Sequence, residues 1–147
     1  DNHYHVLMMS DRRFRLSRFV QQLHGATSKF LNDLDQTPGR KVWDQYWDRR
    51  IRDEIDSSKT FNYNHWNPIK HGLASSLEEA VDYRFCSLGL WVELLGQEVI
   101  EVFFEQYPID QFDPFTNDRL KPVGPSLGTT SLRWERQTLV CQFICQN

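Results

Sequence analysis

The segment Asp1-Asn2-His3-Tyr4-His5-Val6-Leu7-Met8-Met9 decides how the fold begins, because its composition is that of a β-strand. Apolar side chains occur on both faces of an extended backbone here, so both faces are expected to be covered. Ser10 or Asp11 then offers a cap for a following helix. Apolar residues recur after it every three or four positions and predict one amphipathic helix with a single stripe: Leu16, Phe19, Val20, Leu23, Phe30, Leu31 and Leu34.

Two more strands are expected further along the chain. Residues 37–40 have the composition of a turn, and residues 41–52 are aromatic and partly alternating, which predicts a half-buried strand or a hairpin. Apolar residues on both parities of residues 134–145 predict a late strand. Between residues 98 and 133 the repeated prolines and aromatic pairs favour a loop-rich segment.

Helical segments are expected between these strands. One helix is predicted to begin near residues 56–58 and to kink or stop at Asn67-Pro68, because proline lacks the N–H that a helix interior uses. Gly72 suits the left-handed conformation that often ends a helix. Ser76-Leu77-Glu78-Glu79 is a capping-box pattern, which predicts that a further helix begins there.

The composition limits the class of protein. A chain of 147 residues with 39% hydrophobic residues and a net charge of −3 fits one globular domain. No apolar run approaches the roughly 18 residues of a membrane span, and no signal segment opens the sequence, so we expect a cytoplasmic protein without a membrane partner. Residues 1–75 carry 12 basic against 9 acidic side chains, and residues 76–147 carry 5 against 11, so only the first half favours a polyanionic partner.

The three cysteines do not indicate a structural site. Cys86, Cys141 and Cys145 are odd in number and lack the spacing of a zinc finger. Neither a disulfide framework nor a structural metal is therefore expected, and buried thiols are the favoured state.

His3 and His5 are the first candidates for chemistry. They are two positions apart on a predicted strand, so both imidazoles project from one face and can converge on a divalent cation, while Tyr4 points the other way. Partly buried histidines without a metal are the alternative.

Tyr63 and Asn67 form a second candidate pair. Their separation of four positions places them on one face of the expected helix. A carboxamide oxygen can bind Mg²⁺ or Mn²⁺, and a phenol one turn away can attack a phosphate held by that metal. The alternative interpretation is that the tyrosine packs within the helix and that the asparagine serves as a turn residue before proline.

Four segments point to a family when taken together. They are Asn2-His3-Tyr4-His5, Trp43-Asp44-Gln45-Tyr46-Trp47-Asp48-Arg49-Arg50-Ile51-Arg52-Asp53-Glu54, Tyr63-Asn64-His65-Trp66-Asn67-Pro68-Ile69-Lys70-His71-Gly72 and Asp82-Tyr83-Arg84-Phe85-Cys86-Ser87. In order and spacing they resemble the single-tyrosine HUH transposases, and most closely the REP-associated tyrosine transposases. The resemblance covers roughly residues 1–93.

The resemblance implies an α+β fold with a ferredoxin-like antiparallel sheet and helices packed on it. Residues 1–97 would be a catalytic domain whose first strand-helix-strand portion is missing, leaving an exposed sheet edge, and residues 98–147 an unassigned loop-rich extension. Phe85 and Cys86 stand where the family has tryptophan and serine, and Tyr4 replaces a bulky aliphatic residue.

The activity implied is DNA transposition by cleaving and rejoining hairpin-flanked single-stranded DNA. His3, His5 and Asn67 would hold Mg²⁺ or Mn²⁺, and Tyr63 would attack the phosphate to give a 5′-phosphotyrosine and a free 3′-hydroxyl. Since a phenol is mostly protonated at neutral pH, Tyr63 would need a nearby positive charge or a base. His65, two residues away, is expected to pack or to contact DNA. A prokaryotic, nucleoid-associated location follows from the same resemblance.

DNA contacts are expected from basic and aromatic side chains. The phosphate-binding candidates are Arg12, Arg13, Arg49, Arg50, Arg52 and Lys70, and the base-stacking candidates are Trp43 and Trp47. Core packing of the tryptophans and pairing of the arginines with Asp48 and Asp53 are the alternatives.

Two other functions are compatible with the sequence. One is a non-catalytic remnant that only binds DNA hairpins, and the other is a metal-dependent phosphodiester hydrolase that uses water in place of Tyr63. Monomer and homodimer are both open.

Overall fold

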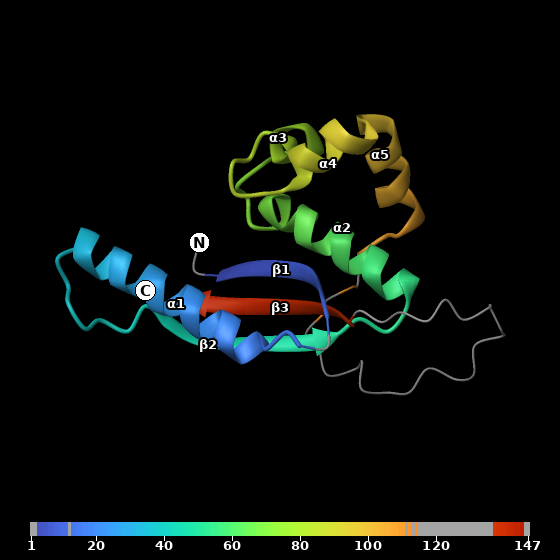
Figure 1. Ribbon diagram of the computed structural model, residues 1–147. Helices are drawn as coiled ribbons and strands as arrows, with labels where there is room; N and C mark the ends of the chain where they lie inside the picture. The colour runs from blue at the N-terminus through green and yellow to red at the C-terminus, as the bar shows by residue number, and fades with distance from the viewer. Residues whose placement is uncertain (1–2, 12, 111, 113, 115–136, 146–147) are drawn as a thin grey trace. The chain divides into compact units, whose positions relative to one another are not determined.

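The computed structural model describes residues 3–11, 13–110, 112 and 114, and the backbone of residues 137–145 (Figure 1). The described chain is α+β, as expected. Its elements are β1 (His3–Ser10), α1 (Leu16–Leu34), β2 (Trp43–Arg50), α2 (Glu54–Lys70), α3 (Leu77–Val81), α4 (Leu88–Leu95), α5 (Gln97–Gln106) and β3 (Gln137–Cys145). None of the helices in this part of the chain combines the length and the hydropathy needed to cross a membrane.

The chain forms two compact units, residues 1–50 with 128–147 and residues 51–127. The boundary expected between residues 97 and 98 falls inside the second unit, after the first residue of α5. Residues 97–106 form helix α5, so the expectation of a loop-rich segment was wrong for this stretch. The reason is that Ile100 packs in the same apolar cluster as residues of α3 and α4, and this burial stabilises the helix.

The first unit contains a three-stranded antiparallel sheet in the order β1-β3-β2. The strand that comes last in the sequence thus lies between the first two (Figure 1). Helix α1 packs on one face of this sheet around the buried Val20, which contacts Tyr4, Val6, Leu16, Phe19 and Trp43. The strands expected at residues 1–9, 41–52 and 134–145 are all present; the ferredoxin-like arrangement stays a prediction.

Helix α1 begins later than the capping residues predicted. Ser10 is the last residue of β1, and the helix starts after Arg15, which makes no side-chain capping bond. Asp11 instead accepts hydrogen bonds from the backbone N–H groups of Arg13 (2.8 Å) and Phe14 (3.0 Å). The predicted cap was therefore wrong, because Asp11 stabilises the turn between strand and helix and does not cap the helix.

The second unit is helical, and its core holds Ala74, Ala80, Leu88 and Ile100. The predicted capping residue of α3 is confirmed, since the Ser76 hydroxyl accepts a hydrogen bond from the Glu79 N–H at 3.3 Å. The Glu79 carboxylate accepts from the N–H of Ser75, whereas the capping-box pattern predicts a bond from the N–H of Ser76.

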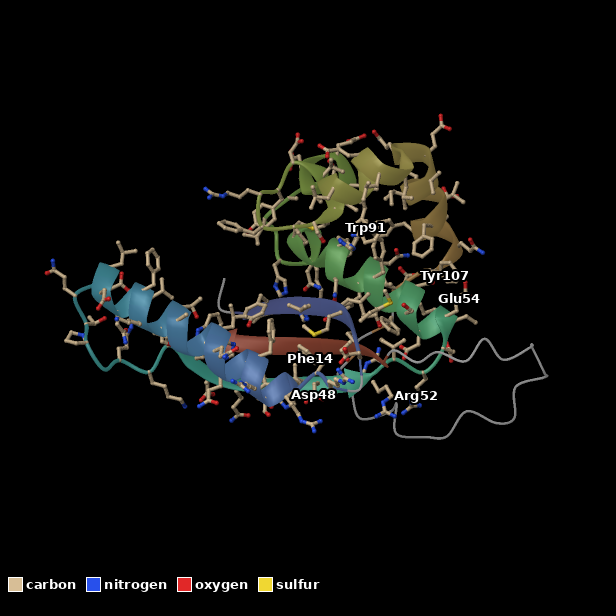
Figure 2. All side chains as sticks on the ribbon, in the orientation of Figure 1. Phe14, Asp48, Arg52, Glu54, Trp91 and Tyr107 are labelled. Carbon is tan, nitrogen blue, oxygen red and sulfur yellow. The ribbon has the colours of Figure 1, made fainter. Side chains whose placement is uncertain are left out.

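Helix α2 begins at Glu54 (Figure 2), slightly before the predicted start, because Asp53 caps it by accepting from the Asp56 N–H at 2.8 Å. Of the two outcomes expected at Pro68, a kink or a stop, the stop does not occur, because the helix continues to Lys70. Proline removes only the N–H that would reach the carbonyl four residues earlier, so two further residues stay helical. Gly72 then adopts the predicted left-handed conformation, with φ of 70°.

Candidate functional site

His3 and His5 project from the same face of β1, as the strand period predicts. Their ring centroids are 5.1 Å apart with the planes at 89°. Both ring nitrogens of His5 are buried. Tyr4 points to the opposite face, where its ring packs edge-on against Trp43 (5.3 Å) and its hydroxyl lies 2.9 Å from His24 Nε2. The two imidazoles can therefore act together on the face of the sheet that α1 does not cover.

Strand pairing brings two DNA-binding candidates to the same face as these histidines. Gln142 of β3 is the partner of His5 on one side and of Trp47 on the other. Directly opposed residues of neighbouring strands project to the same face, so Trp47 shares the face of His5 about 10 Å away, and Arg49 follows two positions later. The Trp47 side chain is 44% exposed, and Arg49 is half-buried.

Trp43 belongs to the core of the first unit. Its ring stacks on His24 at 4.4 Å with the planes at 13°, and its Nε1 donates a hydrogen bond to Thr27 Oγ1 at 2.8 Å. A register shift between Trp43 and Tyr46 separates it from the face that carries Trp47. The structure therefore favours the alternative of core packing for Trp43, whose ring stacks on His24 and contacts Tyr4.

The remaining arginine candidates are distributed over both units. Arg13 is exposed before α1, and Arg50 is exposed with a strand parity opposite to that of Arg49. Arg52 is exposed in the second unit, where its backbone N–H donates to Asp56 Oδ2 at 3.2 Å. Arg12 lies outside the described residues.

Tyr63 is buried in α2 with 7% of its surface exposed, and Lys70 contacts its hydroxyl. Lys70 Nζ donates a hydrogen bond to Tyr63 Oη at 3.0 Å and lies 4.7 Å from the centroid of the tyrosine ring. Seven positions are two helical turns, so the contact depends on α2 continuing past Pro68. The Lys70 ammonium group thus lies beside the phenol oxygen, where negative charge develops when a tyrosine acts as a nucleophile.

Asn67 lies one turn after Tyr63, as predicted, and is 9% exposed. Its Nδ2 donates to the Tyr63 backbone carbonyl at 2.7 Å, which fixes the orientation of the carboxamide. Its Oδ1 is buried and accepts no hydrogen bond from the described part of the chain. This oxygen is the atom expected to bind a metal, and a buried acceptor of this kind favours a cation or another donor.

The expected metal set contains two histidines and one asparagine. Over the residues that the structure describes, no three side chains of the types His, Cys, Asp and Glu gather in one place. The histidine pair belongs to the first unit, and Tyr63, Asn67 and Lys70 belong to the second.

Tyr63 and Lys70 also line a pocket of about 550 Å³ in the second unit. One wall is formed by α2 and the other by the end of α5 and the segment after it. The lining residues are Tyr63, Trp66, Lys70, Phe104, Glu105, Pro108, Ile109, Asp110 and Phe112. A pocket of this volume can hold a small organic group such as one nucleotide.

His65 is a buried packing residue, which fits the first of its two expected roles. Its Nδ1 lies 2.8 Å from the Phe61 carbonyl oxygen and its Nε2 lies 2.8 Å from Ser87 Oγ. The carbonyl requires an N–H at Nδ1, so the Ser87 hydroxyl donates to Nε2. Burial lowers the pKa of His65 to about 4 and so keeps the ring neutral at pH 7. The hydrogen bond to Ser87 joins two of the four segments that carry the family resemblance.

Sequence reasoning missed the contact of Lys70 with Tyr63 and the opposite wall of the pocket. The seven-residue spacing could have signalled the first, once the helix was allowed to continue past Pro68. No local signal points to Phe104 or Asp110, because they come from a segment distant in the chain. Comparisons of this chain with family models, curated proteins and solved structures give no match.

Proposed function

We propose that this protein cleaves and rejoins single-stranded DNA through a covalent bond to Tyr63, as a transposase of the HUH type. The sequence resemblance suggests the reaction. The observation that supports it most is the hydrogen bond from Lys70 Nζ to Tyr63 Oη, at 3.0 Å, on the wall of a nucleotide-sized pocket. An ammonium group at this position is suited to a phenol that acts as a nucleophile.

In the proposed reaction the Tyr63 oxygen forms a bond to phosphorus while the bond from phosphorus to the 3′ oxygen breaks. The phenol proton leaves, and the 3′ oxygen gains a proton to become a free hydroxyl. Lys70 stabilises negative charge on the phenol oxygen and orients it. Because one phosphodiester replaces another, the 3′-hydroxyl can reverse the step without ATP.

His3, His5 and Asn67 would hold the divalent cation in this proposal. The donor set suits Mn²⁺, which accepts imidazole nitrogen as well as amide oxygen, and the buried Oδ1 of Asn67 is in keeping with a cation ligand. When bound, the cation supplies Lewis-acid polarisation of the scissile phosphate. His3 and His5 contribute two neutral nitrogen ligands from one strand face.

DNA binding belongs to the same proposal. Trp47 and Arg49 share a sheet face with His5, so they would contact the strand that carries the scissile phosphate. Arg13, Arg50 and Arg52 would add phosphate contacts from exposed positions. The ferredoxin-like assignment is proposed with them, supported by an antiparallel sheet with α1 on one face.

The test is to trap the covalent intermediate. The chain is incubated with Mn²⁺ and 3′-labelled hairpin DNA that has a single-stranded flank, then denatured and separated by electrophoresis. A labelled protein band that disappears in Tyr63→Phe and persists in Tyr83→Phe would support the proposal. Lys70→Met should slow adduct formation about tenfold, as expected for loss of one charged hydrogen bond.

Other outcomes identify the alternatives. Cleavage without adduct that persists in Tyr63→Phe would indicate a hydrolase that uses water. Binding without cleavage would indicate a non-catalytic DNA-binding protein. His5→Ala should abolish Mn²⁺-dependent cleavage and leave hairpin binding largely intact, and unchanged cleavage would remove His5 from the ligand set.

A further inference from the structure

The pocket beside Tyr63 has an aromatic wall. Trp66 of α2 and Phe104 of α5 both line the pocket and contact each other, with ring centroids 5.8 Å apart and planes inclined at 49°. Trp66 is 37% exposed although it is a large apolar side chain. Aromatic side chains at the mouth of a pocket are suited to stacking against a nucleobase.

The charged side chains of the pocket favour different positions for a base and for a phosphate. Lys70 is the cation among the described lining residues, and it lies against the Tyr63 hydroxyl. Glu105 and Asp110 contribute carboxylates to the opposite wall. The carboxylates repel a phosphate, whereas Lys70 attracts one. A nucleotide is therefore favoured with its phosphate at Lys70 and its base between the aromatic rings and the carboxylates.

We infer that this pocket binds one unstacked base of single-stranded DNA next to the phosphate presented to Tyr63, and that it prefers bases with an exocyclic amino group. A carboxylate accepts hydrogen bonds from the amino groups of cytosine, adenine or guanine, and thymine has no such group. Glu105 and Asp110 are thus the specificity-determining residues, and Trp66 supplies affinity by stacking. The position next to the scissile phosphate rests on the proposed function, but the binding of the base does not.

Binding without metal tests this inference separately from cleavage. The anisotropy of 5′-labelled hexanucleotides dC6 and dT6 is measured with the whole chain in EDTA, where metal-dependent cleavage does not occur. We expect dC6 to bind about fivefold more tightly than dT6. Equal affinity for the two pyrimidines would overturn the inferred preference.

Two variants with matched controls locate the base. Trp66→Leu should weaken dC6 binding about tenfold, whereas Trp91→Leu should leave it unchanged. Trp91 is a fair control because it is 38% exposed on α4 and does not line the pocket (Figure 2). Equal losses in both variants would exclude the pocket as the base site. Circular dichroism of each variant checks that the fold is retained.

Asp110→Asn should reduce the preference for dC6 over dT6, because only the Glu105 carboxylate remains, and Glu101→Gln, on the same helix as Glu105 but outside the pocket lining, should retain it. A preference that survives Asp110→Asn and Glu105→Gln together would overturn the role of the carboxylates. Base-selective binding through Trp66 without any covalent adduct would leave this inference intact and contradict only the proposed reaction.

Discussion

Helices α1 and α2 bury opposite kinds of side chain. In α1 the buried residue is Val20, which packs with apolar neighbours on the sheet of the first unit. In α2 most of the buried residues are polar: Ser58, Thr60, Asn62, His65 and Asn67, beside Tyr63 and Pro68. The apolar stripe of α1 was visible in the sequence, whereas the burial of α2 was not.

The difference shows that burial follows the partners available and not the polarity of the residue alone. Asn62 is fully buried, and its Nδ2 donates to the carbonyls of Phe103 (3.0 Å) and Tyr107 (2.9 Å) at the end of α5. The Phe103 carbonyl also accepts from the Tyr107 N–H at 3.2 Å, whereas the Tyr107 carbonyl lies past the last turn of the helix, where carbonyls lack partners within the helix. The Asn62 amide therefore donates to a group that would otherwise be costly to leave unpaired. Conversely, Phe30 in α1 is 66% exposed although it lies on the apolar stripe.

Of the changes considered for the two helices, loss of the Asn62 side chain should lower the free energy of unfolding most. We expect Asn62→Ala to lower the free energy of unfolding by about 3 kcal/mol, because the Tyr107 carbonyl loses its Asn62 donor, the Phe103 carbonyl loses one of its two donors, and a cavity forms. Asn32→Ala is the matched control in α1, where the amide donates to the Arg40 carbonyl at an exposed position, and should cost less than about 1 kcal/mol. Urea denaturation measures both, and equal losses would contradict the role assigned to Asn62.

Acid should weaken α2 through His65. The folded pKa of His65 is about 4, below the unfolded value of 6.5, so the unfolded chain binds more protons between these two values. The stability contributed by the neutral ring is fully present above pH 6.5 and is lost as the pH falls towards 4. Between pH 7.5 and 5 we expect a loss of about 2 kcal/mol from this residue.

The pH dependence can be assigned with two variants. His65→Asn keeps an N–H near the position of Nδ1 and does not titrate, so its unfolding free energy should fall less steeply with acid than that of the wild type. His24→Gln removes another histidine whose pKa is lowered by burial, and it should retain most of the slope. An unchanged slope in His65→Asn would contradict the assignment.

The smallest expected effect concerns α1. Val20→Ala removes two buried methyl groups and should lower the free energy of unfolding by about 1.5 kcal/mol. Phe30→Ala removes a much larger but exposed side chain and should change it by less than about 0.5 kcal/mol. Thermal unfolding compares the two, and a larger loss for Phe30 would show that the exposed stripe is covered in solution.

The local features that the sequence predicted follow from fixed backbone periods. His3 and His5 had to share a strand face, and Tyr63 and Asn67 had to lie one turn apart, once strand and helix were assigned. Gly72 and Ser76 were recognisable because left-handed turns and helix caps favour few residue types. Whether α2 stops at Pro68 was left open by the sequence, since the effect of one missing hydrogen bond depends on what stabilises the following turn.

By itself, then, the sequence determined which residues share a face within one element, and it supplied the four-segment resemblance. Only the tertiary packing distinguishes the two tryptophans, since Trp43 is partly buried against α1 while Trp47 is exposed. It also decided that Phe104 and Asp110 complete the pocket at Tyr63. The physical reason is that a repeating backbone geometry fixes contacts a few residues apart, whereas contacts between distant segments depend on how whole elements pack.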